Sequence, residues 1–487
     1  MAPYIKYLCL LAILLAVPLR GMAQEVLDPA FDPPFRGGAT GGNKIRWNGT
    51  IGMVIINGKL YQQFGLRPDV PLGKWGVGLD LTLRVDEEGN LKEDEWDEPE
   101  DAIEKVYYIR YGAPGDPLYM RVGALDNVTI GYGIIMHRYA NTIQYPEIKR
   151  VGAYVEGEYG KGGLISWQGM TNNFREFTEP GLFAGRVALR PPIKFSPVFG
   201  ASIGYDGNQY AGLHDSDDDG VPDRLDLFRD VNDRVRVQEI MDTLSADQIQ
   251  QMIEWGYLPD IYHLPGDYRD KKDGVMLTGV DVGFPVAKAK NFSLWGYAQA
   301  AQTLDYGWGW AFPGARSVLG PVEVGLEYRR YEKEFIGDYF DYSYELERAQ
   351  VVPKDSTFDY QTKESRLAGL GKAEGIYGDL TLSLTDIGYV YAWALDMHGP
   401  NYPSGKTFYG EAAATPPQNL SRLRKIAGYF YQPNRPEFFE KLSDGTIYGG
   451  KFFIALAPNV NLVYDHRVTY ANGETYRTVR IETMVSF

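Results

Sequence analysis

Aspartates recur at short intervals in one polar stretch of the chain, residues 215–226, which reads DSDDDGVPDRLD. The spacing D-x-D-x-D-G-x-x-D-x-x-D brings several carboxylates around a tight turn, which Gly220 permits. Hard oxygen ligands in such number suit Ca²⁺. The pattern therefore predicts a calcium site, and a solvated acidic loop without a bound ion is the alternative.

The same stretch resembles a single thrombospondin type-3 calcium repeat, over these residues only. The resemblance implies a ligand set of five carboxylates and one main-chain carbonyl: Asp215, Asp217, Asp219, Asp223, Asp226 and the carbonyl of Val221. Calcium would have a structural role, because it would stiffen a loop that otherwise repels itself. Further along the same loop, Ser245 and Gln248 form a capping box that predicts a short helix ending before Gly256.

Other chemistry finds little support in the sequence. It has no H-x-x-x-H pair, no G-x-S-x-G elbow and no P-loop, and its five histidines have no metal-ligand spacing. Its one cysteine, Cys9, excludes a disulfide framework. The formal net charge of −15 makes nucleic acid a poor partner. We therefore expect a protein that is not an enzyme.

The first residues predict export. Lys6 precedes an apolar run from Leu8 to Leu19, which is followed by the small-x-small sequence Gly21-Met22-Ala23. This arrangement is typical of a cleaved signal peptide at residues 1–23, and an uncleaved anchor is the alternative. Residues 24–44 are rich in Pro and Gly and cannot form a long strand.

Alternation of apolar and polar residues indicates β-strands. From Trp75 to Val85 every second residue is apolar, and the residues between are polar or glycine. The same alternation occurs around residues 183–190, 322–329 and 475–487. Short turns are predicted at 112–116, 160–162, 191–196, 288–291, 377–379 and 458–459. Long connections are predicted at 87–105, 206–273, 336–364 and 396–448. The stretch Gly123–Gly133 fits a glycine-rich strand or turn.

The strands, the loop asymmetry and a terminal strand ending in Phe487 resemble Gram-negative outer-membrane β-barrel proteins. The resemblance implies an all-β fold in which residues 45–487 form a transmembrane antiparallel up-and-down barrel of about 16–18 strands. It also implies short periplasmic turns, long extracellular loops, and Phe487 as a signal for the barrel-assembly machinery. A soluble β-sandwich or propeller is the alternative, since its strands also alternate.

In such a barrel, charged residues on the polar faces would line the lumen. These are Asp80, Arg84, Arg186, Arg190, Glu323, Glu327, Arg329, Arg480 and Glu482. The leading hypothesis is a protein of the cell outer membrane, surrounded by lipid, that passes small polar solutes or ions. In the alternative, the barrel only anchors a surface interaction protein that acts through its calcium-stiffened loops.

Overall fold

The computed structural model describes residues 46–486 with internal gaps. The stretches not included are 57–58, 93–104, 146–147, 175–180, 216–218, 223–234, 237–238, 240–241, 255–267, 269–270, 355–356, 385–386, 403–404, 418–421, 440, 443–444 and 472–473. The predicted signal peptide, the Pro- and Gly-rich segment 24–44 and Phe487 lie outside the described residues.

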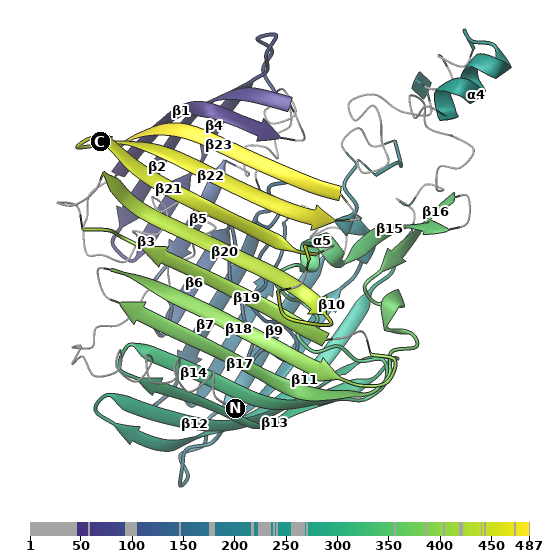
Figure 1. Cartoon of the computed structure of the whole chain (residues 1–487). Coiled ribbons are helices and arrows are strands. Elements are labelled where there is room, and N and C mark those ends of the chain that lie inside the picture. Colours follow the sequence, from purple (N-terminus) through teal and green to yellow (C-terminus); the bar gives the residue numbers. More distant parts are fainter. Residues whose placement is uncertain are drawn as a thin grey trace, which may run out of the picture.

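Long antiparallel strands make up most of the molecule (Figure 1). They are β1 (Arg46–Ile56), β2 (Lys59–Leu72), β3 (Trp75–Leu79), β4 (Leu81–Val85), β5 (Val106–Tyr111), β6 (Leu118–Gly123), β7 (Gly152–Tyr159), β8 (Ile165–Thr171), β9 (Leu182–Leu189), β10 (Val198–Asp206), β11 (Val275–Ala289), β12 (Phe292–Thr303), β13 (Trp308–Leu319), β14 (Val322–Tyr331), β17 (Ala373–Leu384), β18 (Gly388–His398), β19 (Gly405–Ala414), β20 (Leu423–Arg435), β21 (Ile447–Ala457), β22 (Val460–Ala471) and β23 (Glu474–Ser486).

The sheet closes on itself. Each strand pairs with the next along the chain, and β23 returns to β1, with Asn48 opposite Ser486 and Ile55 opposite Val479. β3 and β4 are two halves of one strand, interrupted at Asp80, because both pair with β2. The fold is therefore a closed antiparallel barrel of 20 strands, in agreement with the predicted fold class. Because the strands form one closed sheet, the alternative fold, a soluble sandwich of two sheets, is wrong.

The strand number exceeds the expected 16–18 because the predicted loop 396–448 is wrong: it contains the hairpin β19–β20. Its alternation is weak, since the inner positions carry large aromatic residues such as Tyr409 and Tyr431, while outer positions such as Gly410 and Ala412 are small. The predicted turn at 377–379 is also wrong, because these residues lie within β17.

The two rims of the barrel differ. The connections β10–β11 and β14–β17 lie on one rim, which we call the long-loop rim. The turns β5–β6, β7–β8 and β21–β22 and the C-terminal end of β23 lie on the other, the turn rim (Figure 1). The long connections carry all the helices among the described residues and a second small sheet. These elements are η5 (Gln209–Gly212), α4 (Ala246–Glu254), α5 (Tyr344–Glu347), η6 (Ser365–Leu367), β15 (Ala349–Lys354) and β16 (Thr357–Thr362).

Helix α4 confirms the predicted capping box. The Ser245 main-chain N–H donates to Gln248 Oε1 at 3.0 Å, and the Gln248 N–H donates back to Ser245 Oγ at 3.4 Å. Within the described part of the chain, no helix has the length and apolar character needed to cross a membrane.

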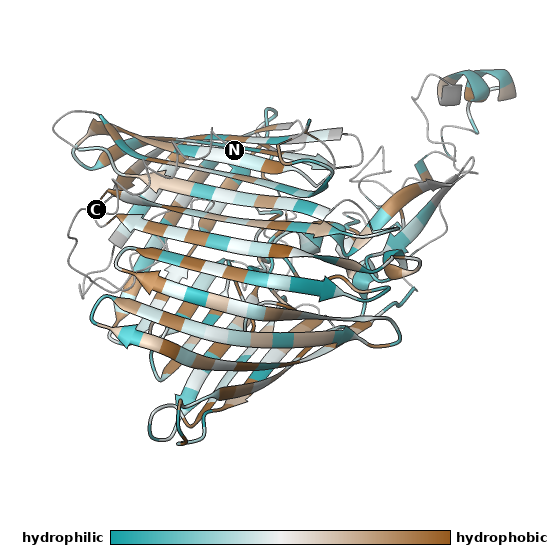
Figure 2. Ribbon diagram, turned by 60° about the horizontal axis from the view of Figure 1, so that its bottom comes forward, coloured by the Kyte–Doolittle hydropathy of each residue, from teal (hydrophilic) through white to brown (hydrophobic). Residues whose placement is uncertain are grey.

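Hydrophobic and hydrophilic residues alternate along many of the strands (Figure 2). Large apolar side chains are exposed on the outer face: Ile51, Met53, Phe64, Leu66, Leu83, Val187, Phe199, Val280, Phe284, Leu326 and Ile376. The positions between them point inward, and many are polar and buried, for example Thr50, Gln63 and Arg84. An apolar outside and a polar inside are what a barrel in lipid requires.

Candidate functional site

The connection between β6 and β7, residues 124–151, turns back into the barrel; we call it the inward segment. Its side chains Ile130, Ile134, Ile135, Met136 and Tyr139 are buried in the interior. Its first part is the glycine-rich stretch 123–133, which we expected to be a strand or turn. The structure confirms a strand end at Gly123 and a turn in which the Gly133 N–H donates to the Ile130 carbonyl at 3.2 Å, and it places much of the stretch in the core of the lumen.

Hydrogen bonds fasten the inward segment to distant parts of the barrel wall. On one side the Ile134 N–H donates to Gln299 Oε1 of β12 at 3.1 Å. On the far side the Tyr145 hydroxyl donates to Asp80, at the junction of β3 and β4, and Arg467 of β22 donates to the Tyr145 carbonyl at 2.9 Å. The segment therefore crosses the lumen.

Glycines on the inner face of β10 and β11 receive the segment. We call them the glycine seat: Gly204, Gly279 and Gly283. A Cβ on Gly283 would lie 1.8 Å from Tyr132 Oη, and a Cβ on Gly204 would lie 2.5 Å from a ring carbon of Phe340. Only glycine permits such close approach of side chains to the wall.

A second piece of chain, residues 332–348 of the β14–β17 connection, lies against the inward segment; we call it the cap. The Asp338 N–H donates to the Ile134 carbonyl at 2.9 Å, and the Phe340 N–H donates to the Ile135 carbonyl at 3.1 Å. The His137 N–H donates to the Phe340 carbonyl at 3.1 Å. The two pieces share one apolar cluster, which includes Leu125, Ile130, Met136, Phe335, Tyr339 and Tyr344.

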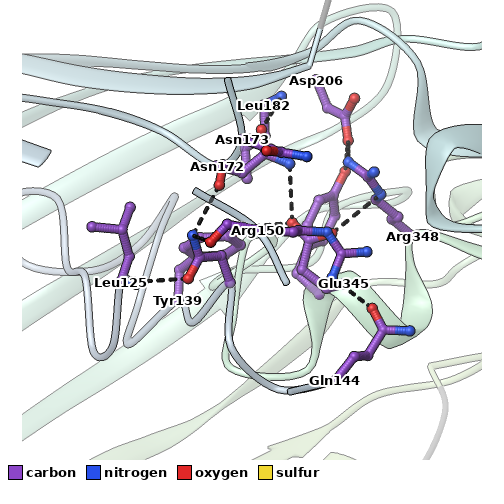
Figure 3. A network of polar contacts seen from close by, with 12 residues as sticks. Leu125, Tyr139, Gln144, Arg150, Asn172, Asn173, Leu182, Asp206, Glu345 and Arg348 are labelled. Carbon is purple, nitrogen blue, oxygen red and sulfur yellow. Dashed lines mark hydrogen bonds and ion pairs between the residues drawn. The ribbon is translucent and has the colours of Figure 1, made fainter. Parts of the chain in front are cut away.

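Buried charges join the cap to the inward segment around Glu345, an arrangement we call the latch (Figure 3). Arg150 Nε lies 3.3 Å and Arg348 Nε 3.5 Å from Glu345 Oε2. The Tyr139 hydroxyl donates to Glu345 Oε1, and the Asn172 amide donates to the same oxygen at 3.2 Å. Burial alone would raise the pKa of Glu345, but the guanidinium groups of Arg348 and Arg150 outweigh it and lower the pKa.

The latch continues to the barrel wall. Arg348 Nη1 lies 3.4 Å from Asp206 Oδ2 at the end of β10, and the Tyr344 hydroxyl donates to the same oxygen at 2.7 Å. Below it, the Asn141 amide donates to the carbonyls of Asn172 at 2.9 Å and Arg150 at 3.2 Å. The inward segment, the cap and the wall thus form one bonded unit, which we call the barrier.

The structure places the predicted lumen residues on the inner face of the wall. Six of them are buried: Asp80, Arg84, Glu327, Arg329, Arg480 and Glu482. Arg186 forms an ion pair with Asp281, with Nη2 and Oδ1 2.6 Å apart. Arg190 and Glu323 lie nearer the turn rim and are partly exposed.

Many of these charges pair with opposite charges on the same strand or on a nearby strand. Arg67 Nε lies 3.0 Å from Asp80 Oδ1, and Arg67 Nη1 lies 3.4 Å from Glu482 Oε2. Arg329 Nε lies 2.7 Å from Glu327 Oε2. The inner wall therefore carries paired positive and negative side chains rather than a ring of side chains with one sign of charge.

Sequence reasoning missed the barrier. The available signal was the apolar character of the β6–β7 connection: Val128, Ile130, Ile134, Ile135 and Met136 fall in a segment that joins two strands, where a solvent-exposed loop is usually polar. Their spacing follows neither strand nor helix periodicity.

The predicted calcium loop is described only in part. Asp215 accepts N–H groups from Asp219 at 3.1 Å and Gly220 at 2.7 Å, and Asp219 accepts the Val221 N–H at 2.7 Å. Asp217, Asp223 and Asp226 lie outside the described residues. The described residues contain no group of three or more His, Cys, Asp or Glu that could hold a metal ion, so calcium binding stays a prediction.

No family model matches the chain, and no curated protein matches it significantly. Solved structures do match its architecture. One is the siderophore receptor PirA from Pseudomonas aeruginosa, with 10% identity, a TM-score of 0.34, and coverage of 92% of this chain and 81% of the receptor.

Porins match as well. The comparison covers 91% of this chain and 96% of Pseudomonas aeruginosa OccK2, solved in complex with glucuronate, at 7% identity and a TM-score of 0.32. A Rhodopseudomonas blastica porin matches with 8% identity and a TM-score of 0.26, and the comparison covers 91% of this chain and 99% of the porin. The closed antiparallel barrel is shown by the strand pairing of this chain itself. At TM-scores this low the likeness carries no argument, and function has to be inferred from the barrel itself.

Proposed function

We propose that the protein is a channel for small polar solutes or ions and that the barrier controls their passage. The main support is the polar inner wall on the turn-rim side of the barrier. There the side chains of Arg316 on β13 and Glu323 on β14 are 40% and 37% exposed and lie 2.7 Å apart. Exposed charges of both signs inside a barrel suit hydrated solutes.

The proposal places the barrel in the cell outer membrane. The apolar outer face supports this location, because exposed side chains such as Ile51, Phe64 and Leu326 would be costly in water and favourable in lipid. Lipid is then the first partner, and insertion by the barrel-assembly machinery is part of the same proposal.

Single-channel conductance in a planar bilayer tests the proposal. The purified protein is compared with Glu345→Gln, which weakens the latch, and with Glu374→Gln, a matched change at an exposed residue of β17. We expect small or brief steps in the unchanged protein and in Glu374→Gln, and larger or longer steps in Glu345→Gln. Folded, inserted protein that stays silent in all three forms would contradict the channel.

The barrier itself favours a second candidate function. A lumen crossed by an apolar cluster with buried ion pairs also suits a closed barrel that only anchors its long connections. The hairpin β15–β16 projects from the long-loop rim (Figure 1) and would take part in binding another envelope component. A silent barrel that retains a partner from the cell envelope would support this function.

We also propose that the loop 215–226 binds calcium and is stiffened by it. Calcium removal by a chelator is expected to speed proteolysis within this loop. Asp219→Asn is expected to lower calcium affinity, whereas Asp247→Asn in α4 is the matched control. Equal proteolysis with and without calcium would count against the site.

A further inference from the structure

Among the described residues, four buried polar atoms near Tyr377 have no hydrogen-bond partner. They are Nδ1 of His137, Nε1 of Trp393, Nη2 of Arg329 and Oδ1 of Asp338. Each side chain belongs to a residue less than 8% exposed: 7%, 4%, 0% and 6%, respectively. We call these four residues and Tyr377 the polar seam.

The polar seam is one contiguous group. Tyr377 of β17 is at its centre, with its hydroxyl 3.1 Å from His137 Nε2 and its ring centre 4.3 Å from the Arg329 guanidinium carbon. The ring centre of Trp393 lies 5.4 Å from that of His137, and Asp338 Oδ2 accepts from Arg329 Nη1 at 2.7 Å. The seam therefore runs where the inward segment and the cap meet β14, β17 and β18.

The unpartnered atoms include both donors and an acceptor. Trp393 Nε1 and Arg329 Nη2 can only donate, and Asp338 Oδ1 accepts. Burial and the positive charges of Arg138 and Arg329 hold the pKa of His137 well below its usual range, so its ring is neutral. A neutral imidazole presents one donor and one acceptor nitrogen.

Water is the species that fits such a group. Asp338 would repel an anion and Arg329 would repel a cation, whereas water both donates and accepts. Buried polar atoms in proteins are nearly always hydrogen-bonded, and ordered water commonly supplies the missing partner. The glycine seat differs, because at Gly283 and Gly204 the side chains of Tyr132 and Phe340 already occupy the space of a Cβ.

We propose that ordered water fills the polar seam and makes it the path by which water passes the barrier. This inference rests on the proposed channel function and narrows what passes while the barrier is in place to water, because Asp338 disfavours anions and Arg329 disfavours cations.

Osmotic water permeability of proteoliposomes, followed by stopped-flow light scattering, tests the seam. The seam variants are Trp393→Phe, which removes the indole N–H, and His137→Phe, which removes both ring nitrogens. Their matched controls are Trp310→Phe and His466→Phe. These residues lie on the outer face of the wall, where Trp310 contacts Tyr328 and His466 contacts Tyr448.

We expect each seam variant to lower water permeability about fivefold. The loss of one hydrogen bond raises the activation free energy for passage by an amount that slows passage by roughly that factor. The controls are expected to match the unchanged protein. Seam variants as permeable as the controls, or unchanged protein no more permeable than empty vesicles, would overturn the inference. A high-resolution map supplies a readout independent of the variants: water within hydrogen-bond distance of Trp393 Nε1 supports the seam, and its absence there overturns it.

Failure of the seam and failure of the channel are distinguishable. If the unchanged vesicles pass no water but Glu345→Gln conducts ions in a bilayer, the channel stands and the seam is wrong. If Glu345→Gln is silent as well, both are wrong.

Discussion

The glycine seat and the latch hold the same inward segment by different means. The seat works through shape: wall positions without side chains accept Tyr132 and Ile135 of the inward segment, together with Phe340 of the cap. The latch works through charge, with Glu345 between two buried guanidinium groups. Shape complementarity is lost gradually as side chains adjust, whereas a buried ion pair that loses one partner leaves an uncompensated charge. The latch is therefore the more sensitive of the two attachments.

Glu345→Gln is expected to have the largest effect. It removes the carboxylate that Arg150 and Arg348 share: Arg348 keeps Asp206, but Arg150 stays buried without its ion-pair partner, a loss of about 3–5 kcal/mol in the stability of the barrier. Hydrogen exchange of the inward segment measures it, and amides near Asn141 should lose protection while the strands keep theirs. Unchanged protection in this segment would show that the latch does not hold the barrier.

Gly283→Val is expected to have a smaller effect, about 1–3 kcal/mol, because the new side chain forces Tyr132 from its place. Protection should be lost around residue 132 and kept around the latch. Gly378→Val is the control, since a Cβ there would meet its nearest atom, the carbonyl oxygen of Gly325, at 3.6 Å. Equal losses in the two variants would contradict a specific seat.

Acidity should act on the cap, and this effect should be the smallest. Burial raises the pKa of Asp341 from 3.8 to about 6; Lys363 opposes the rise and Glu347 adds to it. Because the folded pKa lies above the unfolded one, protonation stabilises the cap. This contribution is present below pH 3.8 and is lost as the pH rises through about 6.

Hydrogen exchange of the cap at pH 4.5 and pH 7.5 (two values chosen on either side of about 6) should show faster opening at the higher pH. In Asp341→Asn the difference should shrink. A pH dependence that the substitution leaves unchanged would assign it to another group, such as Glu364, whose pKa burial and Asp273 raise to about 7.

The sequence predicted the wall where its two faces differ most. In β3, β4, β14 and β23, large apolar residues face outward and polar residues face inward, so the alternation is clear. In β19 and β20 the inner face carries Tyr409, Tyr429 and Tyr431, and aromatic residues on the inside weaken the same pattern. Predicting strands from an apolar outer face and a polar inner face therefore fails at β19 and β20.

The barrier was beyond sequence reasoning for a different reason. Its partners are far apart along the chain: Tyr139 and Glu345 are separated by 206 positions, and Arg138 and Glu411 by 273. No local spacing encodes such pairs. The glycines of the seat were visible, yet glycine within a strand indicates close approach without naming what approaches.

The reach of the inward segment has a consequence for assembly. Tyr145 bonds to a strand 322 positions later in the chain, and the first and last strands must meet to close the ring. Contacts of such long range are slow to form, because the entropy of ordering the intervening chain is lost before they stabilise it. Until then no wall covers Ile134, Ile135 and Met136, and the incompletely folded barrel exposes an apolar surface that favours aggregation. Refolding should therefore show a slow, concentration-sensitive phase, which shortening or deleting residues 124–151 would relieve.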